Sequence, residues 1–213
     1  MNELTSLLGI GIALGLGAAS PGPSFVMIAR TAASAGRARG LSAALGMGLG
    51  AVLFASASLL GLNAVFRAVP TLYVALKLGG GCYLAYLGWR IWRGAGQALE
   101  VRAEEGASPS ARGRRASLLL GLATQLSNPK TALVYASVFA AFLPAAPGLR
   151  YQLAVVVLVF LVETGWYALV AAALSAAAPR ALYLRHKKWL DRAAGGLMGA
   201  LGLKLAASAA DPR

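Results

Sequence analysis

The sequence predicts an all-α membrane protein whose chain crosses the bilayer six times. Of its 213 residues, 58% are hydrophobic and only 13% are charged, whereas a soluble domain carries about 25% charged residues. The apolar residues form six runs, each long enough to cross about 30 Å of hydrocarbon as a helix. Most basic residues lie between these runs. We therefore expect one multi-pass transmembrane domain over 1–213, embedded in a lipid bilayer.

The predicted segments form two groups of three. They cover the ranges Leu4–Ile28, Leu41–Phe66, Thr71–Trp92, Leu118–Leu143, Leu153–Ala178 and Ala193–Ala210. The polar stretch Gly94–Arg115 contains charges of both signs, a proline and small residues, which is typical of a flexible linker. The chain then divides into a first half over 1–93, a linker over 94–115 and a second half over 116–213. Met1-Asn2-Glu3 lacks the positive charge of a signal peptide, so we expect the first segment to be retained.

The distribution of lysine and arginine predicts the orientation, because these residues favour the cytoplasmic side. Fourteen of the twenty lie in three junctions on one predicted side, one of which is the linker. Four lie on the opposite side, where the termini are expected. We therefore expect the linker inside and both the N-terminus and the C-terminus outside. Topology and anionic lipid headgroups also account for the net charge of +13, so we expect no nucleic-acid partner.

Two proline-containing motifs interrupt apolar segments at matching places in the two halves. They read Ser20-Pro21-Gly22-Pro23 and Ser127-Asn128-Pro129-Lys130. Proline removes a backbone donor and clashes with the preceding turn, so both helices should be broken here. Broken backbone at membrane depth is tolerated only where protein buries it or where it lines a wet cavity. Paired breaks in corresponding positions of two halves indicate the binding site of a transporter.

The third segments of the two halves also resemble each other. Leu87-Gly88-Trp89-Arg90 matches Leu201-Gly202-Leu203-Lys204, and at the same offset Gly81 matches Gly195. Two repeats of three crossings each have opposite orientations in the membrane. The sequence therefore predicts two inverted three-helix repeats, with substrate bound near the midplane between them.

Glu163 is the only acidic residue that falls deep within a predicted segment. A carboxylate there is costly unless it is paired or hydrated, so it is a functional candidate. Tyr167 follows by four residues and shares its helix face. A structural ion pair, or a protonated acid bonded to a neighbouring helix, is the alternative interpretation. We favour a functional role in binding a substrate ammonium or exchanging a proton.

Lys130 lies deep in the fourth segment, next to Asn128-Pro129. Asn128 offers donors and an acceptor, and Lys130 could hold a carboxylate or neutralise Glu163. Alternatively, Lys130 only compensates for carbonyls that Pro129 leaves unpaired. Arg30 is a cytoplasmic flank if the first helix stops near Ile28. If that helix continues to Ala35, Arg30 faces an inner cavity and could draw in an anionic group.

Several residues are predicted to have no chemical role. Lys77 lies close enough to the outer end of its segment to reach the interface. Cys82 is the only cysteine, so it forms no internal disulfide or paired redox centre, and we expect it to be a small buried residue. His186 is the only histidine and lies in a basic loop over about 180–192. We therefore expect no metal and no cofactor.

The motifs together resemble the LysE/RhtB family of amino-acid exporters. The resemblance is carried by Ser20-Pro21-Gly22-Pro23, by Tyr83–Arg90, by Asn128-Pro129-Lys130 and by Leu190-Asp191-Arg192. It implies efflux of amino acids or close derivatives across the bacterial inner membrane, driven by the proton gradient, by a monomer or homo-oligomer. Family members often carry an aspartate in the fifth segment, where this chain has Glu163. Related electron carriers need a cysteine pair, and related metal exporters use histidine or acidic clusters, both of which are lacking here.

We therefore predict a secondary transporter, not an enzyme, that exports amino acids by proton antiport with alternating access. The predicted substrate-binding residues are Pro21, Gly22, Pro23, Asn128, Pro129, Lys130, Glu163 and Tyr167. Glu163 is the predicted proton-coupling residue, and Arg30 is a candidate for substrate access. The alternative is a small membrane protein without a transport role, either an accessory subunit or a lipid-modifying enzyme. Such an enzyme needs acids, histidines or a nucleophile clustered at a membrane interface, and the sequence has neither a histidine cluster nor a serine–histidine arrangement at one depth.

Overall fold

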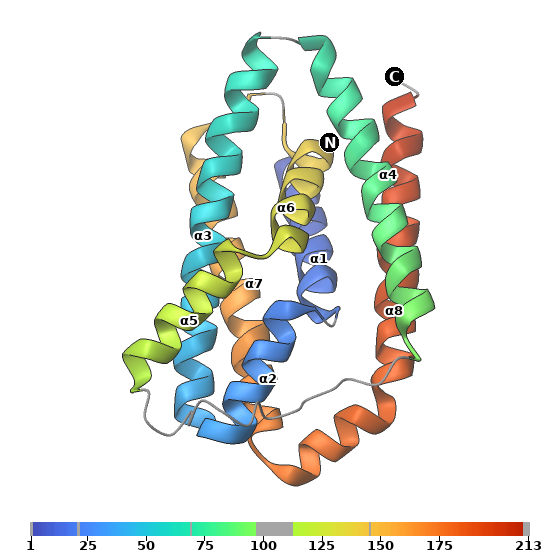
Figure 1. Ribbon diagram of the computed structural model, residues 1–213. Helices are drawn as coiled ribbons and strands as arrows, with labels where there is room; N and C mark the ends of the chain where they lie inside the picture. Colours follow the sequence, from blue (N-terminus) through green and yellow to red (C-terminus); the bar gives the residue numbers. More distant parts are fainter. Residues whose placement is uncertain (1, 21, 69, 97–112, 145, 211–213) are drawn as a thin grey trace.

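The computed structural model describes residues 2–20, 22–68, 70–96, 113–144 and 146–210. Within that part all regular structure is helical (Figure 1). The helices are α1 (Glu3–Ala19), α2 (Pro23–Ala35), α3 (Arg37–Ala68), α4 (Pro70–Gly94), α5 (Arg114–Leu126), α6 (Pro129–Phe142), α7 (Leu149–Leu174) and α8 (Ala177–Ala210). Most of the predicted linker, Pro21 and the side chain of Lys77 lie outside the described residues.

Each predicted apolar segment corresponds to helix, and the first and fourth segments are each divided in two. α1 and α2 replace the first segment and α5 and α6 replace the fourth, with the interruptions at the two proline motifs. The predicted loop over about 180–192 is wrong, because these residues are part of α8. This stretch is rich in Leu, Arg and Lys and lacks glycine and proline, so its intrinsic preference is helical. Figure 1 shows this first part of α8 running across the base of the bundle before the helix turns upright.

By length and hydropathy, fewer helices qualify as membrane-spanning than the six that were predicted. Within the described residues, Arg37–Gly61 of α3 and Leu149–Leu174 of α7 are long and apolar enough to span a bilayer alone. α1 and α2 reach this only together, and their axes differ by 60°. α5 has 13 residues and α6 has 14, so each is roughly 20 Å long and shorter than the hydrocarbon core. The number of crossings stays a prediction.

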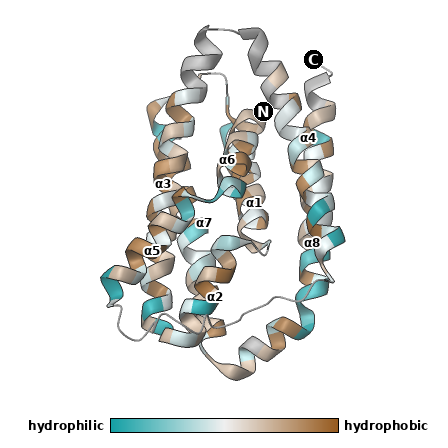
Figure 2. Cartoon of the chain, in the orientation of Figure 1, coloured by the Kyte–Doolittle hydropathy of each residue, from teal (hydrophilic) through white to brown (hydrophobic). Residues whose placement is uncertain are grey.

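The basic junctions gather at one end of the bundle. The α2–α3 junction, the start of α5 and the start of α8 all lie at the lower end of Figure 1, while the start of α1 and the end of α8 lie toward the upper end. Figure 2 shows hydrophilic residues at the starts of α3 and α5 and along the lower part of α8. The structure thus places together the junctions that the charge count assigns to one side.

α4 and α8 pack against each other in antiparallel fashion along a seam of glycines. A Cβ atom on Gly88 would lie 2.3 Å from Gly199 N and 2.6 Å from Gly195 O, and one on Gly81 would lie 2.9 Å from Gly202 O. Real Cβ contacts are never this short, so the backbones approach closely only because these positions are glycine. Cys82 is exposed rather than buried as predicted, because it lies beside this seam and not on it.

α7 separates a lipid-compatible face from a buried face. Leu153, Val157 and Leu161 recur every four residues and are each more than half exposed. A second stripe, which contains Val159, Glu163 and Tyr167, is buried. Because residues four apart share a helix face, the position of Glu163 in the second stripe directs its side chain into the bundle.

Candidate functional site

The two interrupted segments meet inside the bundle. Asn128 Nδ2 donates a hydrogen bond to Ser24 Oγ at 2.8 Å, which joins the start of α6 to the start of α2. Lys130 Nζ donates to the carbonyl oxygens of Gly17 at 3.0 Å and Ser20 at 2.9 Å. Both carbonyls belong to the C-terminal end of α1, where no further turn of helix is available to bond them. The second break thus supplies the donor that the first break lacks.

The prolines begin the second half-helix at each break. Pro23 and Pro129 occupy the first turns of α2 and α6, where a missing N–H removes no helical hydrogen bond and the fixed φ angle suits the helix. Asn128 caps α6, because its side chain accepts a hydrogen bond from Lys130 N at 3.0 Å. Gly22 occupies the same position before α2 and provides no side-chain cap.

Glu163 is buried, at 4% exposure, and receives two side-chain hydrogen bonds. Tyr135 Oη donates to Oε1 at 3.1 Å and Gln125 Nε2 donates to Oε2 at 3.3 Å. Ser24 Oγ in turn donates to Gln125 Oε1 at 3.1 Å. A directed chain of donors therefore runs from Asn128 through Ser24 and Gln125 to the carboxylate. Each polar group of a buried chain of this kind polarises the next. A change in the charge of Glu163 can therefore alter the hydrogen bonds at both breaks.

Lys130 does not pair directly with Glu163. In the described part of the chain its ammonium contacts the α1 carbonyls instead. The alternative considered for Lys130 was compensation for carbonyls that Pro129 leaves unpaired. The carbonyls that Lys130 contacts belong instead to the first break. Removing a carboxylate and an ammonium from water is costly. Here the two donors to the Glu163 carboxylate and the two carbonyl acceptors of the Lys130 ammonium offset part of that cost.

Two of the cavities that adjoin the breaks share Ser20, Gly22, Asn128 and Lys130. The smaller has a volume of about 20 Å³ and also contacts Glu163, Tyr135 and Tyr167, which is room for about one water molecule. The larger has a volume of about 600 Å³, within the usual range for small-molecule sites. Lys130 lies at the boundary between the two.

The predicted site residues fall into three groups. Gly22, Asn128 and Lys130 line both of these cavities, Glu163 and Tyr167 line the smaller of the two, and Pro23 and Pro129 line the larger but not the smaller. Arg30 is half-buried on α2. This helix continues to Ala35, which was the condition for Arg30 to face an inner cavity. Arg30 nevertheless lines neither of these two cavities. Its role in substrate access stays a prediction. Pro21 is not described.

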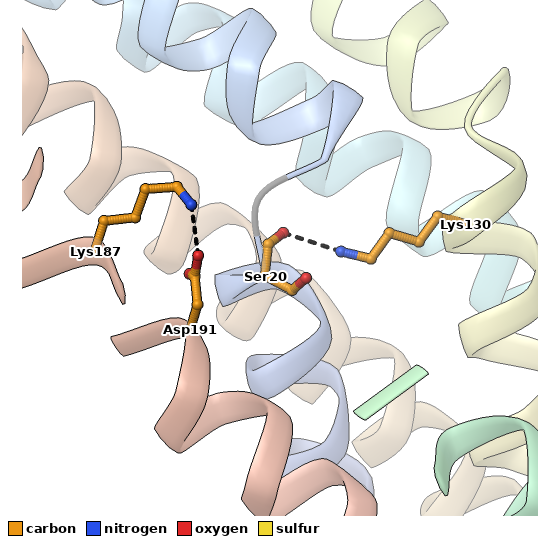
Figure 3. A network of polar contacts seen from close by, with 4 residues as sticks. All are labelled: Ser20, Lys130, Lys187 and Asp191. Carbon is orange, nitrogen blue, oxygen red and sulfur yellow. Dashed lines mark hydrogen bonds and ion pairs between the residues drawn. The ribbon is translucent and has the colours of Figure 1, made fainter. Parts of the chain in front are cut away.

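Sequence reasoning overlooked five polar residues of this region. They are Ser24, Gln125, Tyr135, Lys187 and Asp191, all buried. A glutamine inside an apolar run was an available signal for Gln125, because a buried amide requires partners. Asp191 lies in the middle of α8 and pairs with Lys187 Nζ through its Oδ2 atom at 2.6 Å (Figure 3).

A metal centre has no support in the described part of the chain. No group of three or more His, Cys, Asp or Glu side chains lies close enough together there to hold a metal ion. Carboxylate, imidazole and thiolate groups are the usual protein ligands of Zn²⁺. The polar groups that do converge on the breaks are amides, hydroxyls, one lysine and one carboxylate, which suits the recognition of a polar organic molecule.

Comparison with known proteins identifies the family of the chain. The model of the LysE type translocator family matches residues 16–209. A threonine efflux protein of Salmonella typhi is 33% identical over 156 residues, which cover 73% of this chain and 75% of that protein. The threonine efflux protein of Escherichia coli K12 is 32% identical over the same coverage, and an uncharacterized membrane protein of Haemophilus influenzae is 30% identical over 69% of this chain and 70% of its own. No solved structure matches the chain. The chain belongs to the LysE-type translocator family of membrane proteins, which are transporters and not enzymes.

Proposed function

We propose that this protein exports a small α-amino acid, such as threonine, from the cytoplasm in exchange for protons. The observation that carries the proposal is that the two broken segments meet around Lys130. Glu163 lines the smaller of the two cavities that Lys130 also lines. Broken helices from two halves of a chain form the central site of many secondary transporters. The names of the two efflux proteins support an amino acid as the substrate.

In this proposal the chain crosses the inner membrane six times as two inverted repeats, with both termini outside. The glycine seam supports the repeat. Gly81 contacts Gly202 and Gly88 contacts Gly195, and the comparison of the halves pairs Gly81 with Gly195 and Gly88 with Gly202. Exchanging the halves therefore turns one contact into the other, as a pseudo-two-fold axis requires. The basic junctions at one end of the bundle support a cytoplasmic location for that end.

The larger cavity is then the inward-facing binding site. The substrate carboxylate binds near Lys130, where the N-termini of α2 and α6 add favourable positive potential. Glu163 binds a proton from outside and releases it inside, and the hydrogen-bonded chain to Asn128 transmits this change to the breaks. The two triplets of helices rock around this point, so that inward proton flow drives outward export of the amino acid.

The decisive experiment compares the parental protein with Glu163→Gln in proteoliposomes. Glutamine keeps the shape and can still accept the Tyr135 hydrogen bond, but it cannot exchange a proton. We expect transport of L-threonine driven by a pH gradient to be lost, while exchange of labelled for unlabelled threonine without a gradient persists. Glu3→Gln removes an exposed carboxylate and serves as the matched control.

Two outcomes count against the proposal in different ways. Gradient-driven export by Glu163→Gln at the parental rate would refute the coupling role of Glu163. Failure of the parental protein to transport any of the twenty amino acids would refute amino-acid export itself and favour an accessory role.

A further inference from the structure

The larger cavity contains a charged group that the proposed function does not use. Arg90, Lys130, Lys187 and Asp191 all line it. Asp191 is therefore the single carboxylate among the described residues around the cavity, and it faces three cations. Its side chain is 4% exposed and that of Lys187 is also buried. Figure 3 shows this pair on one side of Ser20 and Lys130 on the other.

The Lys187–Asp191 pair is poorly explained as a helix-stabilising contact. Pairs of this spacing stabilise helices most when the acid precedes the base, and here the lysine comes first. Exposed pairs contribute little, and buried pairs must overcome the loss of hydration of both charges. Replacement by apolar residues would serve packing at least as well. The pair is buried and lies on a cavity wall, as the charged residues of a binding site do.

The carboxylate can accept more hydrogen bonds than the one that Lys187 donates. Lys187 Nζ donates to Oδ2 at 2.6 Å, and an ionised carboxylate has about four acceptor positions. The carboxylate of Asp191 therefore has the chemistry to receive a further donor, such as an ammonium group that enters the cavity it lines.

We propose that Asp191 binds the α-ammonium group of the transported amino acid, that Lys187 holds the carboxylate in place, and that Lys130 attracts the α-carboxylate. The inference rests on the proposed function and deepens it, because it assigns the two ends of a zwitterion to opposite sides of the first break. Leu87, Ile91, Val26 and Leu133 supply an apolar wall for the substrate side chain. Glu163 does not line this cavity, so it remains available for the proton.

The test measures transport and its inhibition in proteoliposomes that contain the full chain. The probes are L-threonine, threoninol, which keeps the ammonium and lacks the carboxylate, and 3-hydroxybutanoate, which keeps the carboxylate and lacks the ammonium. We expect Asp191→Asn to weaken binding of threonine and threoninol at least about tenfold, as loss of a charge-assisted hydrogen bond predicts. Inhibition by 3-hydroxybutanoate should be unchanged. Glu3→Gln is again the matched control.

A second variant separates recognition from a structural role. The exchanged pair Lys187→Asp with Asp191→Lys keeps an ion pair on α8 but moves the acid by one turn. A structural role predicts restored transport, whereas the proposed role predicts none, and size-exclusion profiles verify that both variants fold. Equal loss of all three probes, or rescue by the exchanged pair, would overturn the inference. Parental protein that transports none of the twenty amino acids would instead refute the proposed function.

Discussion

The two breaks have similar sequences but are completed in different ways. At the second, Asn128 caps α6 with its own side chain, so a local group satisfies an amide in the first turn of that helix. At the first, Gly22 offers no side chain, and the carbonyls of Gly17 and Ser20 depend on Lys130 from the other half of the chain. The first break is thus held by a contact that a substrate carboxylate can compete for, whereas the second is held by its own sequence. We therefore expect the first break to move during transport and the second to act as its support.

The largest effect is expected from Lys130→Met, which removes the contact between the breaks. Two carbonyls lose a charged donor, at a cost of roughly 1–3 kcal/mol each if they stay buried. Threonine transport in proteoliposomes should be abolished, and the melting temperature in detergent should fall. Lys188→Met, at an exposed position on α8, is the control. Parental transport by Lys130→Met would show that the first break needs no partner.

Asn128→Ala should have the next largest effect, because it removes the cap of α6 and the hydrogen bond to Ser24 together. Loss of a cap alone costs about 1 kcal/mol, and up to about 2. The melting temperature should fall, and transport should decrease because the start of α6 loses the two contacts that hold it. Ser127→Ala, at the adjacent exposed residue, leaves both hydrogen bonds intact. Identical melting temperatures for the two variants would contradict local completion of the second break.

Ser24→Ala is expected to be milder and to test the connection between the breaks. It removes the donor to Gln125 and the acceptor for Asn128, at about 1 kcal/mol for a neutral hydrogen bond. Because Ser24 and Asn128 share one bond, the loss of stability in the double variant with Asn128→Ala should be smaller than the sum of the single losses. Thermal unfolding of all three variants provides the measurement. Strict additivity would mean that the two breaks are energetically independent.

The smallest effect on stability is expected from Gly22→Ser, which gives the first break a capping side chain like that of the second. The φ angle of Gly22 is −154°, which any residue adopts, and a Cβ atom would lie 3.4 Å from Lys130 Cδ. Serine should raise stability by a few tenths of a kcal/mol and slow transport if the first break must move. Gly148→Ser, at the uncapped start of α7 with open space around it, should stabilise the fold without slowing transport. A lower melting temperature for Gly22→Ser would contradict the comparison.

The helices and the positions of the breaks could be predicted because they depend on neighbours in the chain. Apolar runs of membrane length and the properties of proline are visible without any long-range contact, and Glu163 within such a run already implies a buried partner. The loop expected near 180–192 shows the limit of charge patterns. A basic stretch indicates a side of the membrane, but its helix propensity decides the local conformation.

The sequence by itself determined that this chain is apolar and that two of its apolar segments are interrupted at proline motifs. Only the tertiary structure decided which groups these interruptions bring together. Ser20 and Lys130 are 110 residues apart and Ser24 and Asn128 are 104 apart, and no local rule selects one partner over another at that distance. The choice follows from helix packing, because a buried ammonium, amide or carboxylate must accept whatever complementary group the folded bundle places beside it.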